Sequence, residues 1–245
     1  MNDKVKIVIL AAGLGKRMQS ENPKVLAEVR GKSMLERLSQ AAQEVTGSNA
    51  TAIVGHQADL IKSRFGDSLT YVIQEKQLGT GHALLVAKDE LKDAEHIVVL
   101  YGDQPLITSE TIKNLIKKHL DSGAKITFAT TLVPDFSDWR AYFIKLGRVL
   151  RKDNKITCIR EYNDAIEEER SIKEINIGCF VFNAKWLWGN LEKIENKNRQ
   201  KEYYVTDLIP MAFRNGNLVE GIPINPREAL GANSKEELEI LEKFA

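Results

Sequence analysis

The chain has 245 residues, of which 43% are hydrophobic and 28% are charged, a composition typical of a globular protein with its own core. With 35 basic and 34 acidic residues the formal net charge is +1, which gives no indication of a nucleic-acid track or a membrane-surface patch. Two cysteines and four separated histidines make neither a disulfide framework nor a zinc motif. The longest apolar run, residues 7–12, is too short to span a bilayer, and no signal-peptide pattern precedes it. We therefore expect a cytoplasmic protein that binds neither nucleic acid nor membrane.

The first half of the chain alternates strand-like and helix-like segments. Strands are predicted at residues 4–10, 50–54, 69–73, 96–101 and 126–132, and helices at 33–45, 58–65, 82–91 and 108–120. This alternation predicts an α/β fold with a doubly wound, mostly parallel, Rossmann-like sheet. Ligands bind such sheets beyond the carboxyl ends of the strands, so residues 11–16, 74–80 and 101–105 are expected around one crevice.

The pattern changes after about residue 134. Strands are predicted at 143–149, 155–162 and 175–182, with a hairpin turn at 151–154, and helices at 206–214 and 234–243. The last helix begins with a Ser234 to Glu237 capping box. We expect one domain, 1–245, with a nucleotide-binding half, 1–133, and a smaller mixed half, 134–245, that covers the crevice and holds a second substrate.

A glycine-containing turn follows the first predicted strand. It reads Leu10, Ala11, Ala12, Gly13, Leu14 and Gly15. Small residues let backbone N–H groups approach a phosphate, and Arg17 and Lys24 then supply a forked cation and a point charge. The spacing is neither GxGxxG nor GxxxxGK[ST]. A turn that needs glycine for its geometry alone is the alternative.

This turn, with Arg17-Met18 and Pro23-Lys24, resembles the signature of the sugar-nucleotide pyrophosphorylases. Segments 74–83, 101–107, 174–178, 202–207 and 231–233 are similar to bacterial N-acetylglucosamine-1-phosphate uridyltransferase, in the same order. The resemblance covers nearly the whole chain and is to the uridyltransferase part of that family, whose bifunctional members carry a β-helix acetyltransferase after it. It implies a Mg²⁺-dependent nucleotidyltransferase that makes UDP-N-acetylglucosamine and pyrophosphate from UTP and N-acetylglucosamine 1-phosphate, by in-line attack on the α-phosphate.

The resemblance also implies roles for individual residues. Asp103, after a predicted buried strand, and Asn233 are the implied Mg²⁺ ligands, which suits an ion that takes few protein oxygens. Arg17 and Lys24 are the implied catalytic cations. The implied substrate-binding residues are Leu10, Ala11, Ala12, Gly13, Gln74, Gly79, Thr80, Tyr101, Gly102, Gly147, Glu161 and Asn176. Local alternatives are a turn-forming Asp103, a helix N-cap at Asn233 and a ligand-free loop at 79–81.

Two stretches depart from the family pattern. The family usually carries Gly-Tyr-Gly-Arg before the Glu161 strand, whereas this chain has Lys145-Leu146-Gly147-Arg148, which puts the sugar in doubt. Gln104 stands beside Asp103 where a small apolar residue is expected. Three rival functions remain: a related nucleotidyltransferase making a CDP-alcohol, dTDP-sugar or molybdopterin dinucleotide, a catalytically silent binding module, and a Rossmann dehydrogenase. The sequence does not specify an oligomeric state.

Overall fold

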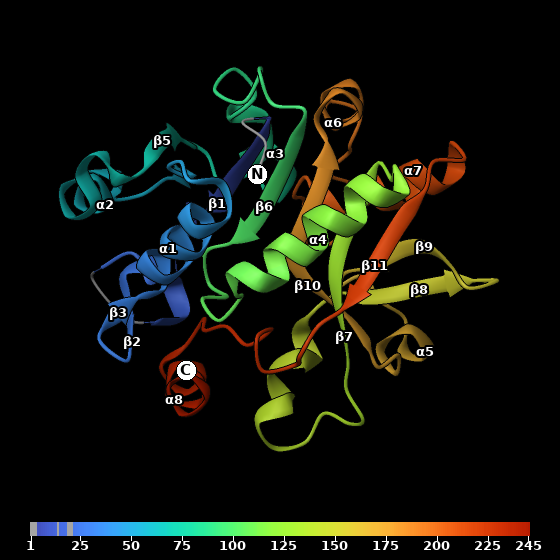
Figure 1. The fold of residues 1–245 in the computed structure, drawn as a ribbon. Helices are drawn as coiled ribbons and strands as arrows, with labels where there is room; N and C mark the ends of the chain where they lie inside the picture. The colour runs from blue at the N-terminus through green and yellow to red at the C-terminus, as the bar shows by residue number, and fades with distance from the viewer. Residues whose placement is uncertain (1–3, 14, 19–21) are drawn as a thin grey trace.

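The computed structural model describes residues 4–13, 15–18 and 22–245, and within them a nine-stranded sheet forms the centre of the molecule (Figure 1). Its strands are β1 (Val5–Leu10), β4 (Thr51–Val54), β5 (Thr70–Ile73), β6 (His96–Tyr101), β7 (Ile126–Leu132), β8 (Arg148–Lys152), β9 (Lys155–Arg160), β10 (Glu174–Asn183) and β11 (Val219–Pro223). A separate two-stranded hairpin joins β2 (Glu28–Val29) to β3 (Lys32–Ser33).

The central strands lie in the order β11-β7-β10-β6-β1-β4-β5. β4, β1 and β6 are parallel neighbours, and β5 is parallel to β4. The chain runs outward from β1 to β4 and β5, then returns to place β6 on the other side of β1. The strand order therefore reverses between β1 and β6, which confirms the predicted doubly wound, mostly parallel sheet.

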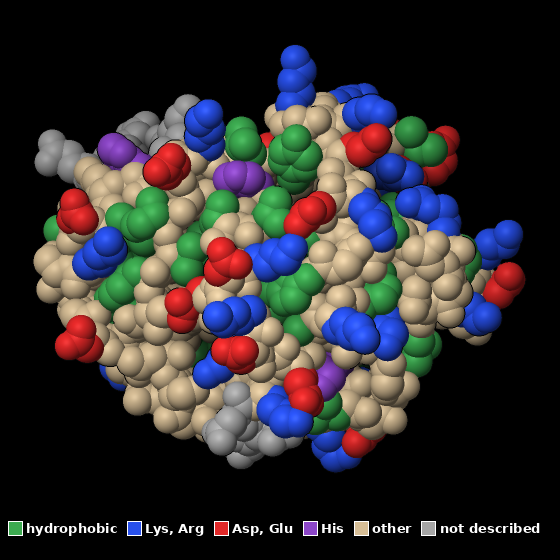
Figure 2. Space-filling model, turned by 90° about the horizontal axis from the view of Figure 1, so that it is seen from above, with side chains coloured by type: hydrophobic (Ala, Val, Ile, Leu, Met, Phe, Trp, Pro, Cys, Tyr) green, Lys and Arg blue, Asp and Glu red, His purple; other side chains and the backbone are tan. Residues whose placement is uncertain are grey.

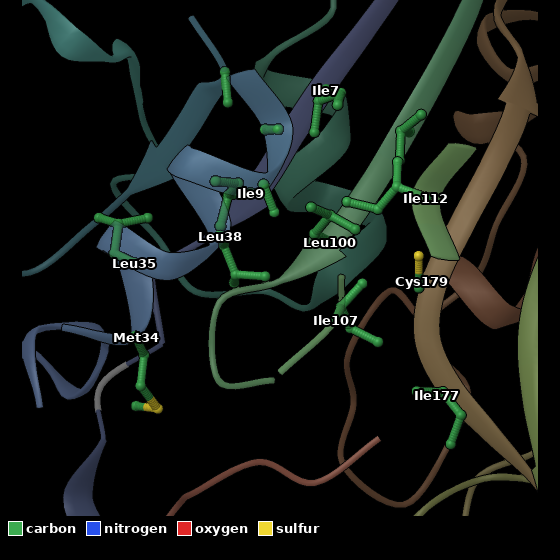
Figure 3. Packing of buried hydrophobic residues seen from close by; sticks show 14 of the residues in the cluster. Ile7, Ile9, Met34, Leu35, Leu38, Leu100, Ile107, Ile112, Ile177 and Cys179 are labelled. Carbon is green, nitrogen blue, oxygen red and sulfur yellow. The ribbon is translucent and has the colours of Figure 1, made fainter. Parts of the chain in front are cut away.

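Helices cover both faces of this sheet. They are α1 (Met34–Thr46), α2 (Ala58–Phe65), α3 (Thr80–Val86), α4 (Ser109–Ser122), α5 (Glu167–Arg170), α6 (Ala184–Leu191), α7 (Leu208–Arg214) and α8 (Lys235–Phe244). Alternate residues of β1 enter different cores: Ile7 and Ile9 pack with α1 and α4, as Figure 3 shows, whereas Val8 packs with α3, α6 and α7. Both faces of β1 are apolar because both are covered by helices.

β10 joins the two predicted halves of the chain. It belongs to the half 134–245, yet it lies antiparallel between β6 and β7 of the half 1–133. Its eight central residues are all buried, as expected for a strand covered on both faces. The two halves therefore share one sheet.

Three predicted elements differ from the observed ones. The first three residues of the predicted strand 143–149 instead end a 3₁₀ helix, η4 (Asp138–Lys145), and the strand begins only at Arg148. The predicted helix 82–91 begins earlier, at Thr80, and ends at Val86. The hairpin turn predicted at 151–154 is a two-residue loop, Asp153-Asn154, with both φ angles positive (50° and 61°), as the twist of a tight hairpin favours. The elements α5, α6 and β11 and the β2–β3 hairpin were not predicted from the sequence.

The described surface is mixed in charge. In the view from above, Lys and Arg side chains are interspersed with Asp and Glu rather than gathered by sign (Figure 2). This agrees with the formal charge of +1. Among the helices of the described residues, none has the length and hydropathy that a bilayer crossing needs.

Candidate active site

A cavity of about 220 Å³ opens at the carboxyl ends of β1 and β6, where the strand order reverses. Nine predicted site residues line it: Leu10, Ala12, Gly13, Lys24, Gln74, Gly79, Thr80, Tyr101 and Asp103. The fold thus joins the glycine-containing turn, the segment after β5 and the end of β6 at one place.

Ala11 and Gly102 fix the backbone positions at the ends of β1 and β6, beside the cavity. Ala11 is buried and its N–H donates to the carbonyl of Ile53 (2.8 Å), which continues the pairing of β1 with β4. The N–H of Gly102 donates to the carbonyl of Leu10 (3.0 Å). A Cβ at Gly102 would lie 2.6 Å from the Leu10 oxygen, so only glycine permits the close approach of these two strand ends.

Lys24, Asp103 and Asn233 converge at the cavity wall. The Lys24 ammonium, on the 3₁₀ helix η2 (Lys24–Leu26), donates to Asp103 Oδ2 at 2.7 Å and to Asn233 Oδ1 at 2.8 Å. Only 12% of the Lys24 side chain and 20% of the Asp103 side chain are exposed. Asp103 and Asn233, which are 130 residues apart in the chain, therefore both bind the same ammonium group.

The start of α8 holds Asn233 in place. Ser234 is the N-cap, and its Oγ accepts from the N–H of Glu237 at 3.3 Å. The Glu237 carboxylate in turn accepts from the N–H of Asn233 at 2.7 Å, one residue before the N–H that a capping box uses. The neighbouring Ala232 N–H donates to the carbonyl of Asp103 (3.0 Å). Asn233 is thus not the cap, and its side chain is free to face Lys24.

Gln104 has a structural role in this arrangement. It is buried, and its Nε2 donates to the carbonyl of Ala229 (3.4 Å). Nearby, a Cβ at Gly231 would lie 2.3 Å from the Asp103 carbonyl oxygen, which requires glycine at that contact. Gln104 therefore helps to tie the end of β6 to the segment that carries Asn233.

Gln74 and Gly79 also line the cavity. Gln74 is 3% exposed, and its Nε2 lies 3.2 Å from the Gly79 carbonyl oxygen and 2.9 Å from His82 Nδ1. Gly79 has a φ of 110°, and a Cβ there would lie 2.6 Å from the carbonyl oxygen of Tyr203. Glycine is needed at this position for both its conformation and its close contact.

The segment that follows α6 closes over the start of α3. The N–H of Tyr203 donates to the Leu78 carbonyl (2.8 Å), and the N–H of Gly81 donates to the Tyr203 carbonyl (2.7 Å). Thr80 Oγ1 accepts from the N–H of Val205 at 3.0 Å. These bonds fix Thr80 at the cavity through a segment more than 120 residues away in the chain.

Gly147, Glu161 and Asn176 form a second group. The N–H of Asn176 donates to the Gly147 carbonyl (2.9 Å), and a Cβ at Gly147 would lie 3.5 Å from Glu161 Oε2. Glu161 Oε1 accepts from the Thr206 hydroxyl at 2.9 Å. Loss of hydration raises the pKa of Glu161 to about 7, against the lowering effect of the Thr206 hydrogen bond.

Tyr101 connects the two groups. It lines the cavity, and its ring packs against Gly178, where an added Cβ would lie 2.5 Å from ring carbon Cδ2. Burial, with the nearby Glu161 carboxylate, raises the pKa of the Tyr101 hydroxyl far above its usual range, so the hydroxyl stays protonated and can donate. Tyr101 therefore lies close to both the cavity and the Glu161 carboxylate.

Arg17 lies apart from this arrangement. It is exposed on the 3₁₀ helix η1 (Lys16–Met18) and is not among the described residues that line the cavity. Conversely, Gln77 and Glu202 line the cavity and His82 contacts Gln74, although none of the three was predicted as a site residue from the sequence. All three lie within the two segments that resemble the uridyltransferase, but only their contacts distinguish them.

Asp103 and Asn233 are a suitable donor pair for Mg²⁺. Within residues 4–13, 15–18 and 22–245 there is no cluster of three or more His, Cys, Asp and Glu side chains that could hold a metal ion. Mg²⁺ needs no such cluster, because it takes one or two protein oxygens and completes its shell with phosphate oxygens and water. The two oxygens already bind one positive charge, the Lys24 ammonium.

Comparisons with known proteins agree with this geometry. Residues 7–152 match the family described as the MobA-like NTP transferase domain. The bifunctional protein GlmU of Fervidobacterium nodosum is 39% identical over 98% of this chain and 50% of its own length, and that of Acetivibrio thermocellus is 40% identical over 94% and 49%. The chain thus spans about half the length of these curated relatives. A crystal structure assigned as a glucose-1-phosphate thymidylyltransferase from Bacillus anthracis superposes with a TM-score of 0.76 at 19% identity, covering 98% of this chain and 95% of the other, and so has the same fold. The chain belongs to the MobA-like NTP transferase domain family and is a nucleotidyltransferase.

Proposed function

We propose that this chain joins UTP to N-acetylglucosamine 1-phosphate, with release of pyrophosphate and formation of UDP-N-acetylglucosamine. The observation that carries the proposal is that Lys24 binds both Asp103 and Asn233 at a cavity that Lys24 and Asp103 line together with Gln74 and Gly79. The resemblance to bifunctional GlmU proteins over nearly the whole chain supports the choice of uridyl and amino-sugar substrates.

The proposed chemistry needs charge neutralisation rather than a general base. A sugar phosphate is already ionised at neutral pH, so its oxygen can attack the α-phosphorus in line while pyrophosphate leaves. Lys24 would bind the α-phosphate or the sugar phosphate once it leaves Asp103 and Asn233. Arg17, on the exposed η1, would approach the leaving pyrophosphate, and the backbone N–H groups near Ala12 and Gly13 would orient the phosphates.

Asp103 and Asn233 would hold Mg²⁺ in this scheme. When bound there, Mg²⁺ would supply Lewis-acid polarisation and neutralise phosphate charge. Lys24 would have to share or give up these oxygens, because its ammonium lies within hydrogen-bond distance of both. A Lys24 side chain that gives them up would be available to bind a phosphate.

The two groups of the site would divide the substrates between them. The residues near Gln74 and Gly79 would bind the base, in the half 1–133. Gly147, Glu161 and Asn176 would bind the sugar in the half 134–245. Glu161 follows β9 and Asn176 lies on β10, and β8 pairs with both strands; a carboxyl group and an amide suit the hydroxyl and acetamido groups of an amino sugar. Leu146, which replaces the family tyrosine, contributes its carbonyl to Arg148, so the backbone of this turn is held without the tyrosine ring.

Pyrophosphate release from purified protein with Mg²⁺ tests the proposal. UTP, CTP, dTTP and GTP are each paired with N-acetylglucosamine 1-phosphate, glucosamine 1-phosphate and glucose 1-phosphate. We expect rapid release only with UTP and the acetylated sugar. Activity with UTP and another sugar would show that the sugar assignment is wrong and that the altered 139–148 segment changes the sugar preference. Activity with dTTP or CTP would overturn the uridyl assignment. A folded protein that binds UTP without any turnover would instead be a silent binding module.

A further inference from the structure

The contacts of the amide nitrogen determine how the Gln74 side chain is oriented. Gln74 is buried to 3% exposure at the cavity wall, and its Nε2 lies 3.2 Å from the Gly79 carbonyl oxygen. A backbone carbonyl oxygen only accepts hydrogen bonds, so the amide atom facing it must be the nitrogen that donates. The amide orientation therefore follows from chemistry, because the reversed amide would place two acceptors together.

His82 takes the second hydrogen of the same amide nitrogen. Its Nδ1 lies 2.9 Å from Gln74 Nε2, and a nitrogen that already faces a donor must itself be the unprotonated acceptor. Both amide hydrogens of Gln74 are then used inside the protein, one by Gly79 and one by His82. The atom of the Gln74 side chain that remains for a ligand is the amide oxygen, which can only accept.

An acceptor at this point discriminates between pyrimidine bases. Uracil and thymine carry a hydrogen on ring nitrogen N3, whereas N3 of cytosine is a lone-pair acceptor that would repel the amide oxygen. We propose that His82 is a positioning residue that fixes the Gln74 amide and so makes the site select a base with a ring N–H over cytosine. This inference rests on the proposed function in taking the cavity as the nucleotide site.

The Gly79 carbonyl alone would orient the Gln74 amide less firmly. This carbonyl is itself well fixed, because Gly79 packs against the Tyr203 backbone, but it accounts for only one of the two amide hydrogens. Without His82 the second hydrogen would be buried without a partner, which favours reorganisation of the amide. His82 also borders a separate cavity of about 260 Å³ on α3, so its own ring is not enclosed by packing alone. The hydrogen bond between Gln74 and His82 thus orients both side chains.

Two matched variants test this role. His82→Leu keeps the approximate volume and removes the acceptor, whereas His82→Asn keeps a side-chain oxygen near the position of Nδ1. UTP and CTP dissociation constants are measured by calorimetry in Mg²⁺ buffer without a sugar phosphate, and thermal unfolding confirms that each variant is folded. We expect the preference for UTP over CTP to fall about tenfold in His82→Leu and to stay close to that of the unaltered protein in His82→Asn.

The binding readout separates this inference from the proposed reaction. An unaltered protein that prefers UTP but releases no pyrophosphate would remove the proposed function and leave the role of His82 in place. An unchanged UTP to CTP ratio in His82→Leu would overturn the inference, as would equal binding of both nucleotides by the unaltered protein. If His82→Leu does not fold, His82→Gln replaces it, because its longer side chain carries the amide away from the Nδ1 position and is expected to lose the preference as well.

Discussion

At the scale of single residues, Lys24 is the centre of the proposed phosphate chemistry. Its ammonium bridges Asp103 and Asn233 and keeps their oxygens together. An electrostatic site of this kind has little need for a base, and its rate depends on charges that are already in place when the substrates arrive. The two oxygens should therefore matter to turnover far more than to folding.

Replacement of Asp103 by alanine tests that expectation. We expect Asp103→Ala to lower kcat by about a hundredfold or more, as for other groups that stabilise a charged transition state, with little change in thermal unfolding. Asp121→Ala, which removes an exposed carboxylate paired with Lys117, is the matched control and should keep full activity. Near-normal turnover in a folded Asp103→Ala protein would exclude Asp103 from the site.

At the scale of elements, Arg148 determines the path of the chain before β8. Its side chain is 1% exposed, and its guanidinium donates to the carbonyls of Phe143, Ile144, Leu146 and Arg170. Burial lowers the pKa of Arg148, but the planar set of guanidinium N–H donors matches the four carbonyl oxygens around it. These hydrogen bonds stabilise residues 143–145 in η4 rather than in the predicted strand, and they hold Gly147 beside Glu161.

The variant Arg148→Lys should loosen this turn. A lysine ammonium cannot reproduce the planar fork, so buried carbonyls lose partners and the free energy of unfolding should fall by about 2 kcal/mol. We also expect KM for the sugar 1-phosphate to rise while KM for UTP stays the same, because Gly147 lies in the group proposed to bind the sugar. Arg199→Lys, at an exposed position, serves as the control. Equal increases in both KM values would contradict this division of the site.

At the scale of the whole molecule, the buried His119, which packs against His96, links stability to pH. His119 is 1% exposed, its Nδ1 lies 3.0 Å from Thr127 Oγ1, and its ring meets that of His96 edge-on at 5.1 Å. Burial, with the neighbouring His96 and Lys125, lowers the pKa of His119 to about 4, from 6.5 in the unfolded chain. Between these pH values the unfolded state binds one more proton than the folded state, so folding weakens as pH falls.

Denaturant unfolding of His119→Gln from pH 7 to pH 4 measures this contribution. For His119 alone, the free energy of unfolding should fall by about 1.4 kcal/mol for each pH unit below 6.5, and the variant should lack that slope. The difference between the two proteins isolates it from Glu161, whose raised pKa acts in the opposite direction. His56→Gln, at an exposed position, is the control. Parallel curves for His119→Gln and the unaltered protein would show that His119 titrates alike in both states.

The doubly wound sheet is predictable from sequence, because apolar strands that alternate with helices have few other ways to bury both faces of a sheet. Seven of the nine predicted residues at the cavity lie in the segments 11–16, 74–80 and 101–105, which were expected there because the carboxyl ends of parallel strands meet at one edge of the sheet. Tertiary packing places β10 between β6 and β7, brings the Arg148 guanidinium to the carbonyls of η4, and brings His82 Nδ1 to the Gln74 amide. Local patterns report which face of an element is apolar, but strand order and contacts between distant side chains depend on how the whole chain packs.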